Sequence, residues 1–483
     1  MRRTLFFMGN GPSPHGLLSR LFRAALVFAT ALRTFADDTA SLQPPPAFKK
    51  LRYDENYQYL RDPSQRSDFL DAIKFIRLNT DRDSYLTLGG EIRERYEYYG
   101  NNLWGRGPQD DNGYWLQRYM VHADAHLGEA FRLFAQFKSG LEDGRNGGPR
   151  PTDRDDFDLH QAFADARFPW SDEDSLTLRA GRQELAYGSS RLVSIREEPN
   201  VRRSFDGIKA ILKLNDWQVD AFATKPVRTK TGVFDDDPDP DQNFWGLYAV
   251  TPLSWMPGGN VDLYYLGLDR KNAAFDQGTA HELRHSLGTR IWAHIAGWDY
   301  NFEFVYQLGS FGAGDIQAWT AASDTGFTFE TAPLKPRLGL KANVTSGDRN
   351  SNNHDLQTFN PLFPRGAYFG EPALIGPANH IDVHPQLELA LHKTLSLALN
   401  WDWFWRESTH DGIYGPAVNV IQSGKTSDAR YVGDQAEALL EWRIDRHFTF
   451  TADYAHFFAG DFLRETTPGK DVDYFSAWAT FRF

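Results

Sequence analysis

The sequence predicts an all-β fold, a closed antiparallel transmembrane β-barrel of about 18 strands with short periplasmic turns and long extracellular loops. Three observations predict it. From Leu86 to the C-terminus, apolar and polar residues alternate, as in strands whose two faces meet different surroundings. The connections between these strands alternate between long and short. The chain is polar on average, with a mean hydropathy of −0.53, and has no apolar run long enough to cross a bilayer as a helix.

The composition of the 483 residues excludes several classes of protein. There are 52 Lys and Arg against 64 Asp and Glu, so the formal net charge is −12. This argues against a nucleic-acid partner, because binding to phosphates depends on clustered cations. The absence of cysteine excludes disulfides, thiolate nucleophiles and cysteine-built metal sites. No phosphate-binding loop or Ser/His/Asp set is evident, so the sequence predicts neither an enzyme nor a cofactor.

The N-terminus has the layout of a secretory signal peptide, predicted to cover residues 1–36. Basic residues precede a short apolar stretch, 24–32, and a small-residue cleavage site ends at Ala36. Because Arg20 and Arg23 crowd the apolar stretch, an amphipathic start or a misassigned initiator is the alternative.

A periplasmic segment is predicted to follow, over residues 37–84. It begins with a proline-rich linker, and Ser67 is expected to cap a short amphipathic helix over residues 68–78. The barrel is predicted to occupy residues 85–483.

The barrel strands are predicted from their alternation. Their expected starts are near Tyr85, Tyr114, Ala130, Leu159, Ser175, Ser204, Trp217, Asn243, Asn260, Leu283, Gly297, Asp315, Lys335, Val383, Thr394, Tyr431, His447 and Val472. The long connections cover 100–113, 141–158, 187–203, 227–242, 348–382 and 407–430. Tight turns lie between them, and on the long-loop side only 310–314 breaks the pattern. The last strand ends in Phe483, an ending typical of outer-membrane proteins of Gram-negative bacteria, whose assembly machinery reads it.

Basic residues recur on the face of the strands that is expected to line an aqueous lumen. Their clustering on adjacent strands favours an anion-selective lumen, because guanidinium groups bind carboxylates at close range. The alternative is that they form cross-strand charge ladders with the lumen acids. The candidate pore-lining residues are Arg93, Arg95, Arg118, Arg179, Arg182, Arg202, Arg203, Arg337, Lys341 and Arg365.

An acidic run lies in one predicted loop, at residues 235–241, and contains five aspartates. Carboxylates in such a run can hold a hard divalent cation. The alternative is a solvated surface loop whose charges repel one another, and the sequence assigns no metal site.

One segment resembles the alginate export family of outer-membrane proteins. It begins with Arg179-Ala-Gly-Arg182-Gln183 and continues to Pro199-Asn200-Val201-Arg202-Arg203. The resemblance implies an 18-stranded monomeric barrel with an arginine-lined constriction that passes an anionic polysaccharide outward. It implies constriction roles for Arg179 and Arg182, and Arg365 is a further candidate. The resemblance also implies a gate, because in the family a long periplasmic turn two strands before the end closes the barrel. This chain has only Asp445-Arg446 at that place. Either the gate is lost or segment 37–84 replaces it.

A rival motif, His281-Glu282-Leu283-Arg284-His285, matches the H-E-x-x-H pattern of zinc proteases. The following residues alternate as in a strand. In a strand, the two histidines are too far apart to share one ion, since each residue adds about 3.3 Å.

The sequence therefore predicts an outer-membrane channel of a Gram-negative bacterium for anionic, alginate-like polysaccharide or oligosaccharide. The alternatives are a porin for small anionic solutes and an outer-membrane zinc hydrolase that uses His281 and His285. The expected partners are outer-membrane lipid, the polysaccharide, the assembly machinery through Phe483, and periplasmic export components. The chain is expected to be a monomer.

Overall fold

The computed structural model describes residues 45–79, 84–350 and 352–483, and the predicted signal peptide lies outside them. Eighteen strands form a closed antiparallel barrel, in which each strand pairs with its neighbours in the chain. The last strand closes the barrel on the first, in a register that runs from Glu91 opposite Arg482 to Gly100 opposite Asp473. Among the described residues, the 18 barrel strands have no unpaired edge strand, which removes the usual template for edge-to-edge association.

The barrel strands have the following bounds: β2 (Tyr85–Gly100), β3 (Tyr114–Leu127), β4 (Phe131–Asp143), β5 (Asp155–Pro169), β6 (Ser175–Gln183), β7 (Phe205–Leu214), β8 (Trp217–Arg228), β10 (Gln242–Pro252), β11 (Gly259–Phe275), β12 (Gly278–Ile295), β13 (Trp298–Phe311), β14 (Gly314–Thr328), β15 (Arg337–Thr345), β16 (His380–His392), β17 (Leu395–Trp405), β20 (Tyr431–Arg443), β21 (Phe448–Ala459) and β22 (Val472–Arg482). Each predicted strand is present. The largest difference is at β12, which begins at Gly278 rather than near Leu283.

Short helices, turns and strands lie outside the barrel strands. They are α2 (Asp71–Lys74), α3 (Asn102–Gly105), α4 (Asp461–Thr466), β1 (Ile76–Arg77), β9 (Asp237–Pro238), β18 (Ile413–Tyr414), β19 (Val420–Gln422) and single 3-10 turns at Arg52–Asp54, Gln58–Arg61, Pro63–Gln65 and Gly424–Thr426. None of the helices in the described ranges is long and apolar enough to cross a membrane.

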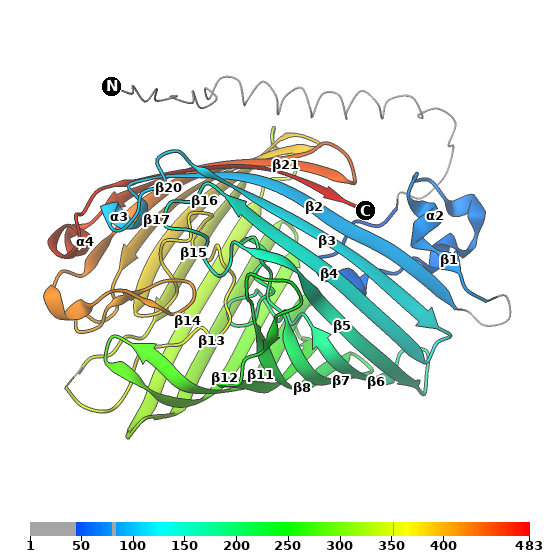
Figure 1. Ribbon diagram of the computed structural model, residues 1–483, viewed down its shortest axis with the longest axis horizontal. Coiled ribbons are helices and arrows are strands. Elements are labelled where there is room, and N and C mark those ends of the chain that lie inside the picture. The colour runs from blue at the N-terminus through cyan, green and yellow to red at the C-terminus, as the bar shows by residue number, and fades with distance from the viewer. Residues whose placement is uncertain (1–44, 80–83, 351) are drawn as a thin grey trace, which may run out of the picture.

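The two ends of the barrel differ in their connections. Figure 1 shows α3 and α4 at the left end, which carries the long loops, and α2, β1 and the C-terminus at the right end, which carries the short turns. The long-loop end has two tight connections, at 276–277 and 312–313. The sequence predicted only one short connection on this side, at 310–314. The extra one arises because β12 begins at Gly278, before its expected start, and leaves only two residues between β11 and β12.

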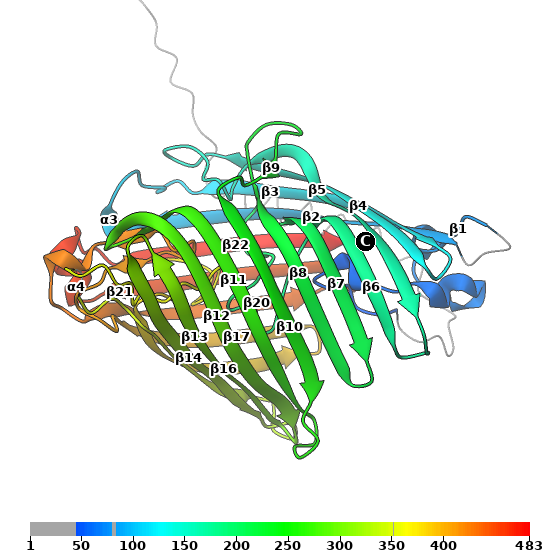
Figure 2. The ribbon, with the colours of Figure 1, turned by 90° about the horizontal axis from the view of Figure 1, so that it is seen from below.

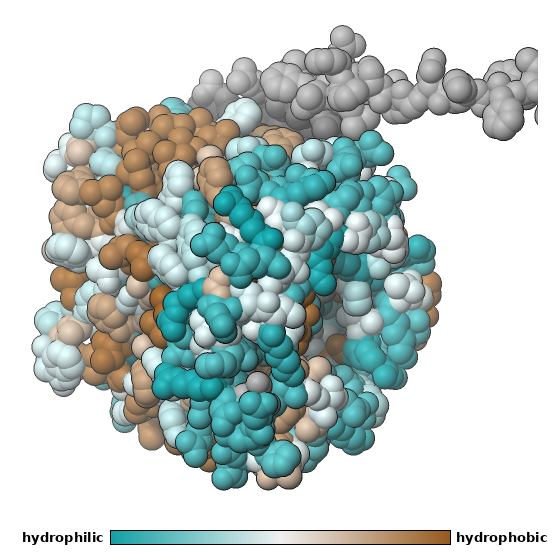
Figure 3. All heavy atoms as spheres, turned by 90° about the vertical axis from the view of Figure 1, so that its left-hand side faces the viewer, coloured by the Kyte–Doolittle hydropathy of each residue, from teal (hydrophilic) through white to brown (hydrophobic). Residues whose placement is uncertain are grey.

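Large apolar side chains cover the outside of the barrel. Figure 2 shows β7, β8 and β10 crossing the barrel obliquely, side by side. From these and other strands, Ile208, Leu247 and Leu340 are 62%, 46% and 50% exposed. Figure 3 shows the long-loop end, where hydrophilic side chains cover the centre and hydrophobic ones gather at its left side. Apolar side chains exposed over a closed barrel are typical of a surface that faces lipid.

The helix predicted over residues 68–78 is too long. The structure has only one helical turn, α2, because β1 pairs with β2 and requires extended backbone from Ile76. The predicted cap by the Ser67 side chain is also wrong. Instead, the backbone N–H groups of Ser67 and Asp68 donate to Oδ2 of Asp71, each at 2.8 Å.

Candidate functional site

Two long loops fold into the barrel and meet inside it. They are the β6–β7 loop, residues 184–204, and the β15–β16 loop, residues 346–379. The N–H of Phe363 donates to the Leu192 carbonyl at 2.8 Å, and the N–H of Ser194 donates to the Phe363 carbonyl at 2.9 Å. The two loops, called the inner loops below, therefore form a hydrogen-bonded constriction across the lumen.

Three predicted pore-lining arginines hold the β6–β7 loop. Arg93 donates to the Glu197 and Pro199 carbonyls at 3.1 and 3.0 Å, and Arg118 donates to the Glu197 carbonyl at 2.9 Å. Arg95 donates to the Glu198 carbonyl at 3.3 Å. The rigid guanidinium fork suits this use, because one side chain can bind several acceptors at once. These arginines therefore anchor the constriction, and their side chains are buried beneath the loop that they hold.

Most of the predicted pore-lining cations are ion-paired. The bidentate pairs are Arg179 with Asp165, at 2.7 and 2.8 Å, and Arg182 with Asp206, at 2.8 and 3.0 Å. The predicted residues with a carboxylate within 4.0 Å are Arg95, Arg118, Arg179, Arg182, Arg202, Arg337 and Arg365. A nearby carboxylate cancels much of the field of each cation. These residues therefore match the charge-ladder alternative in geometry.

The other three predicted cations, Arg93, Arg203 and Lys341, have no carboxylate partner in the described parts of the chain within 4.0 Å. The guanidinium of Arg203 lies 4.9 Å from the centre of the Phe363 ring. Sequence reasoning missed a further cation, Arg196, in the β6–β7 loop. Burial lowers the pKa of its guanidinium to about 10, and the charge of Glu198 only partly offsets this effect. The alternation could not have found it, because it lies between strands.

A cavity of about 1130 Å³, called the vestibule below, opens at the short-turn end of the lumen. Its basic lining residues are Lys49, Arg132, Arg167, Arg179, Lys209 and Lys213. Arg132, Arg179 and Lys209 are paired with Asp124, Asp165 and Asp220. Lys49, Arg167 and Lys213 have no carboxylate within 4.0 Å among the residues that the structure describes. These three side chains are free to attract an anion from solution.

The opposite wall of the lumen is acidic. Asp382, Asp402, Glu437 and Asp453 lie on β16, β17, β20 and β21 and are at most 7% exposed. Across the residues described, none of them has a Lys or Arg within 4.0 Å. The lumen is therefore not uniformly cationic: β2 to β7 carry arginines that are mostly paired with acids, whereas β16 to β21 carry these four buried acids without a Lys or Arg partner in the described residues.

The H-E-x-x-H motif lies in β12, as its alternation predicted. His281 pairs with Asp269 at 2.7 Å, and His285 contacts the Tyr265 hydroxyl at 2.8 Å. Glu282 points to the other face, where it is fully buried and pairs with Arg270 and Arg284. The alternation of a strand therefore separates the glutamate from both histidines, and the motif lacks the geometry of a zinc protease.

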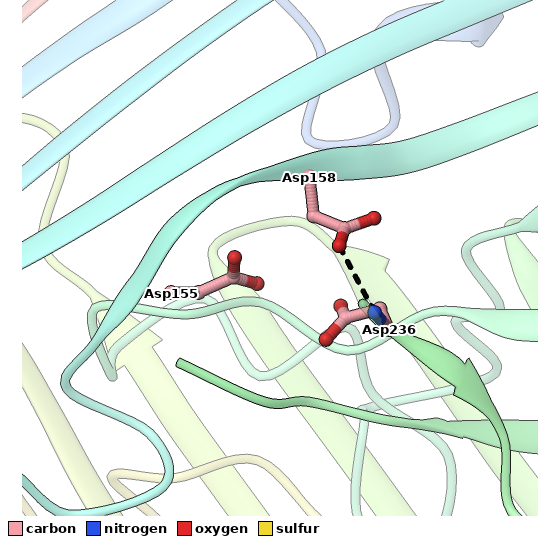
Figure 4. A group of neighbouring side chains, drawn as sticks. All are labelled: Asp155, Asp158 and Asp236. Carbon is pink, nitrogen blue, oxygen red and sulfur yellow. Dashed lines mark hydrogen bonds between the residues drawn. The ribbon is translucent and has the colours of Figure 1, made fainter. Parts of the chain in front are cut away.

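Three aspartates meet inside the barrel, and one of them comes from the predicted acidic run. Figure 4 shows Asp155, Asp158 and Asp236 facing one another, with the Asp236 N–H donating to Asp158 at 3.0 Å. The ammonium of Lys138 lies 2.6 Å from Asp155 and 2.8 Å from Asp236. Lys138 therefore supplies the positive charge that a bound cation would supply.

Elsewhere in the acidic run, aspartates pair with surface cations. Asp237 contacts Arg228 and Lys230, and Asp241 contacts Lys271. The loop is thus not an unpaired solvated run, because β4, β8, β11 and the loop itself supply counter-charges to its aspartates.

A profile of the family described as alginate export matches residues 84–476 of this chain. No curated protein sequence matches it. Several crystal structures of Pseudomonas aeruginosa proteins have a similar fold. OccK8 (OprE) is 12% identical with a TM-score of 0.57, over 83% of this chain and 98% of that chain. OccK2 (OpdF), in complex with glucuronate, is 9% identical with a TM-score of 0.54, over 85% and 99%. OpdK with vanillate is 11% identical with a TM-score of 0.53, over 82% and 98%.

Proposed function

The chain belongs to the alginate export family, and from this premise we propose that it is an outer-membrane channel, rather than an enzyme, for anionic polysaccharide or oligosaccharide. The observation that carries the proposal is the vestibule, where Lys49, Arg167 and Lys213 line a cavity of about 1130 Å³. Cations that lack carboxylate partners bind the carboxylates of a uronate chain as it enters. The cavity is large enough for several sugar units, since ligand sites of about 300–1,000 Å³ enclose drug-sized molecules.

The proposed orientation follows from the two ends of the barrel. The short-turn end, where segment 45–78 lies, faces the periplasm, and the long loops face outward from a Gram-negative cell. The apolar outer surface contacts lipid. The assembly machinery reads the C-terminal strand and Phe483, and periplasmic export components deliver the polymer. The closed sheet supports a monomer, because it offers no strand edge to a second copy.

A second candidate is a porin for small anionic solutes. It is favoured by the inner loops, which narrow the lumen by meeting across it. The ligands bound in the similar structures of OccK2 and OpdK, glucuronate and vanillate, are small carboxylates.

Planar-bilayer recordings test the proposal. In a salt gradient, the reversal potential should show anion selectivity, and Lys213→Gln should reduce it. Oligouronates should block the current, whereas small carboxylates should not; the reverse pattern would favour the porin. A cation-selective pore would refute both candidates.

A further inference from the structure

The N-terminal segment lies across the short-turn end of the barrel and is tied to several strands. Arg52 donates to the carbonyls of Gly90 and Phe483 at 2.9 and 2.7 Å. Thr87 donates to the Lys74 carbonyl at 2.7 Å. The segment is therefore docked on the first and last strands of the barrel rather than hanging free (Figure 1, Figure 2).

Residues 49–55 of this segment enter the lumen. Tyr53 is only 5% exposed, and its hydroxyl donates to the Glu184 carbonyl at 2.9 Å. Its ring packs edge-on against Phe163, with ring centres 5.4 Å apart. Further along, Arg202 donates to the Lys50 carbonyl at 2.9 Å. The segment thus reaches the β6–β7 inner loop and lines the vestibule on the side of the constriction.

The cations of the vestibule hold this segment. The guanidinium of Arg179 lies 4.3 Å from the centre of the Tyr53 ring, and Arg132 donates to the Tyr53 carbonyl at 2.5 Å. Cations stacked on aromatic rings and bonded to carbonyls are attractive contacts. The segment therefore contacts two carboxylate-paired arginines on the wall of the same cavity that the unpaired Arg167 and Lys213 line.

Asp54 adds a carboxylate to the same place. It lines the vestibule. Burial raises the pKa of its carboxyl group, and nearby cations, Arg179 and Lys209 first among them, lower it. Asp54 therefore places a carboxyl group in the cavity that a uronate unit would enter, without an ion pair to any described Lys or Arg within 4.0 Å.

We propose that residues 50–55 are an intramolecular ligand of the vestibule: at rest they lie against Arg132 and Arg179 and close the path from the vestibule to the inner loops, and an anionic oligosaccharide that binds the unpaired Lys49, Arg167 and Lys213 displaces them. The displacement by substrate rests on the proposed function. The closure of the path to the inner loops does not rest on the proposed function, because it is argued from the position of Tyr53 and Asp54 in the lumen.

Single-channel conductance tests the closure. Tyr53→Ala should raise the resting conductance several-fold, because it removes the ring that fills the gap beside Arg179. Phe69→Ala is the matched control, since Phe69 is an aromatic of the same segment that is 63% exposed. It should conduct like the unchanged protein. Heat-modifiable electrophoretic mobility shows whether each variant forms a barrel.

A cross-link tests the closure without removing the ring. The chain has no cysteine, so Lys50→Cys combined with Ser190→Cys introduces a unique pair. The two side chains meet at 3.5 Å between Nζ and Oγ. Joined by a short bis-thiosulfonate reagent, this variant should stay closed when oligouronate is added, and dithiothreitol should restore opening.

Protease accessibility tests the displacement. Trypsin should cut the unchanged protein after Arg52 faster when oligouronate is present, because Arg52 is 4% exposed at rest. A neutral oligosaccharide of equal length should have no effect. Cleavage that is unchanged by oligouronate would overturn the displacement.

The results separate this proposal from the function on which it rests. The closure would be overturned if Tyr53→Ala conducts like the unchanged protein and the cross-linked variant still opens when oligouronate is added. Anion selectivity would then still stand, because it is measured by the reversal potential. Cation selectivity in every variant would refute the proposed function but leave the closure supported.

Discussion

Removing one unpaired cation should change selectivity more than removing a neutral ion pair. Lys213 lines the vestibule without a carboxylate within 4.0 Å in the described residues, whereas Arg182 is bidentate to Asp206 at 2.8 and 3.0 Å. The matched variants are Lys213→Gln and the double variant Arg182→Gln with Asp206→Asn. The double variant removes both charges of the pair and leaves the net charge unchanged.

The expected effects follow from Coulomb's law in a water-filled lumen. A unit cation about 5 Å from an anion contributes roughly 332/(80 × 5), about 0.8 kcal/mol, or about a fourfold gain in local anion concentration. For a pair whose carboxylate lies 2.8 Å farther away, the second charge subtracts about 0.5 kcal/mol, which leaves about 0.3 kcal/mol. The effect of the pair is therefore less than about twofold.

The assay is the reversal potential in planar bilayers at low ionic strength, where screening is weakest. Lys213→Gln should lower the ratio of anion to cation permeability clearly, and the double variant should change it little. The reasoning is refuted if the double variant loses as much anion preference as Lys213→Gln, because the paired arginines would then control selectivity.

Three further predictions follow from individual contacts. Although burial lowers the pKa of His447, its bonds to Asp68 and the Arg482 carbonyl raise it overall, and Asp68 has a lowered pKa. The contact between His447 and Asp68 therefore stabilises the docked segment below about pH 6.5, and this stabilisation is lost as the pH rises through the raised pKa of His447. Arg446 is the other charged group that faces Asp68. Resting conductance should rise with pH over that range, and Asp68→Asn should remove the dependence. Glu282→Gln should destabilise the barrel by about 3–5 kcal/mol in urea unfolding, because it leaves the buried guanidinium of Arg284 and the partly buried one of Arg270 without their carboxylate; unchanged stability would contradict this. His281→Ala should not alter the zinc content of the refolded protein, and loss of stoichiometric zinc would revive the hydrolase alternative.

The fold could be predicted because its signal is local. Strand alternation has a period of two, so the lipid-facing and lumen-facing sides of β2 or β12 can be read from a few adjacent residues. The same alternation is enough to place His281 and Glu282 on opposite faces of β12. It failed at the hairpin of β11 and β12, where β12 begins at Gly278 rather than near Leu283.

For the candidate site, the sequence predicted residue types and strand faces but not whether each cation is free or paired with a carboxylate. Alternation indicated that Arg179 faces the lumen, and Arg179 lines the vestibule. Arg182 lies three residues further along β6, and the family resemblance rather than the alternation made it a candidate. Whether a cation is free or paired depends on the neighbouring strand and on the register, which place Asp165 beside Arg179 and Asp206 beside Arg182. Whether the predicted cations bind substrate stays a prediction.

By itself, the sequence determined the closed barrel, its two unlike ends and the face on which each strand residue lies, because each of these follows from short-range periodicity. Only the tertiary structure decided what fills the lumen. Tyr53 meets Glu184 across 131 residues of sequence, and Arg93 meets Glu197 across 104. No local pattern encodes such contacts, since they exist only after the barrel has closed and brought distant loops and the N-terminal segment into one enclosed space.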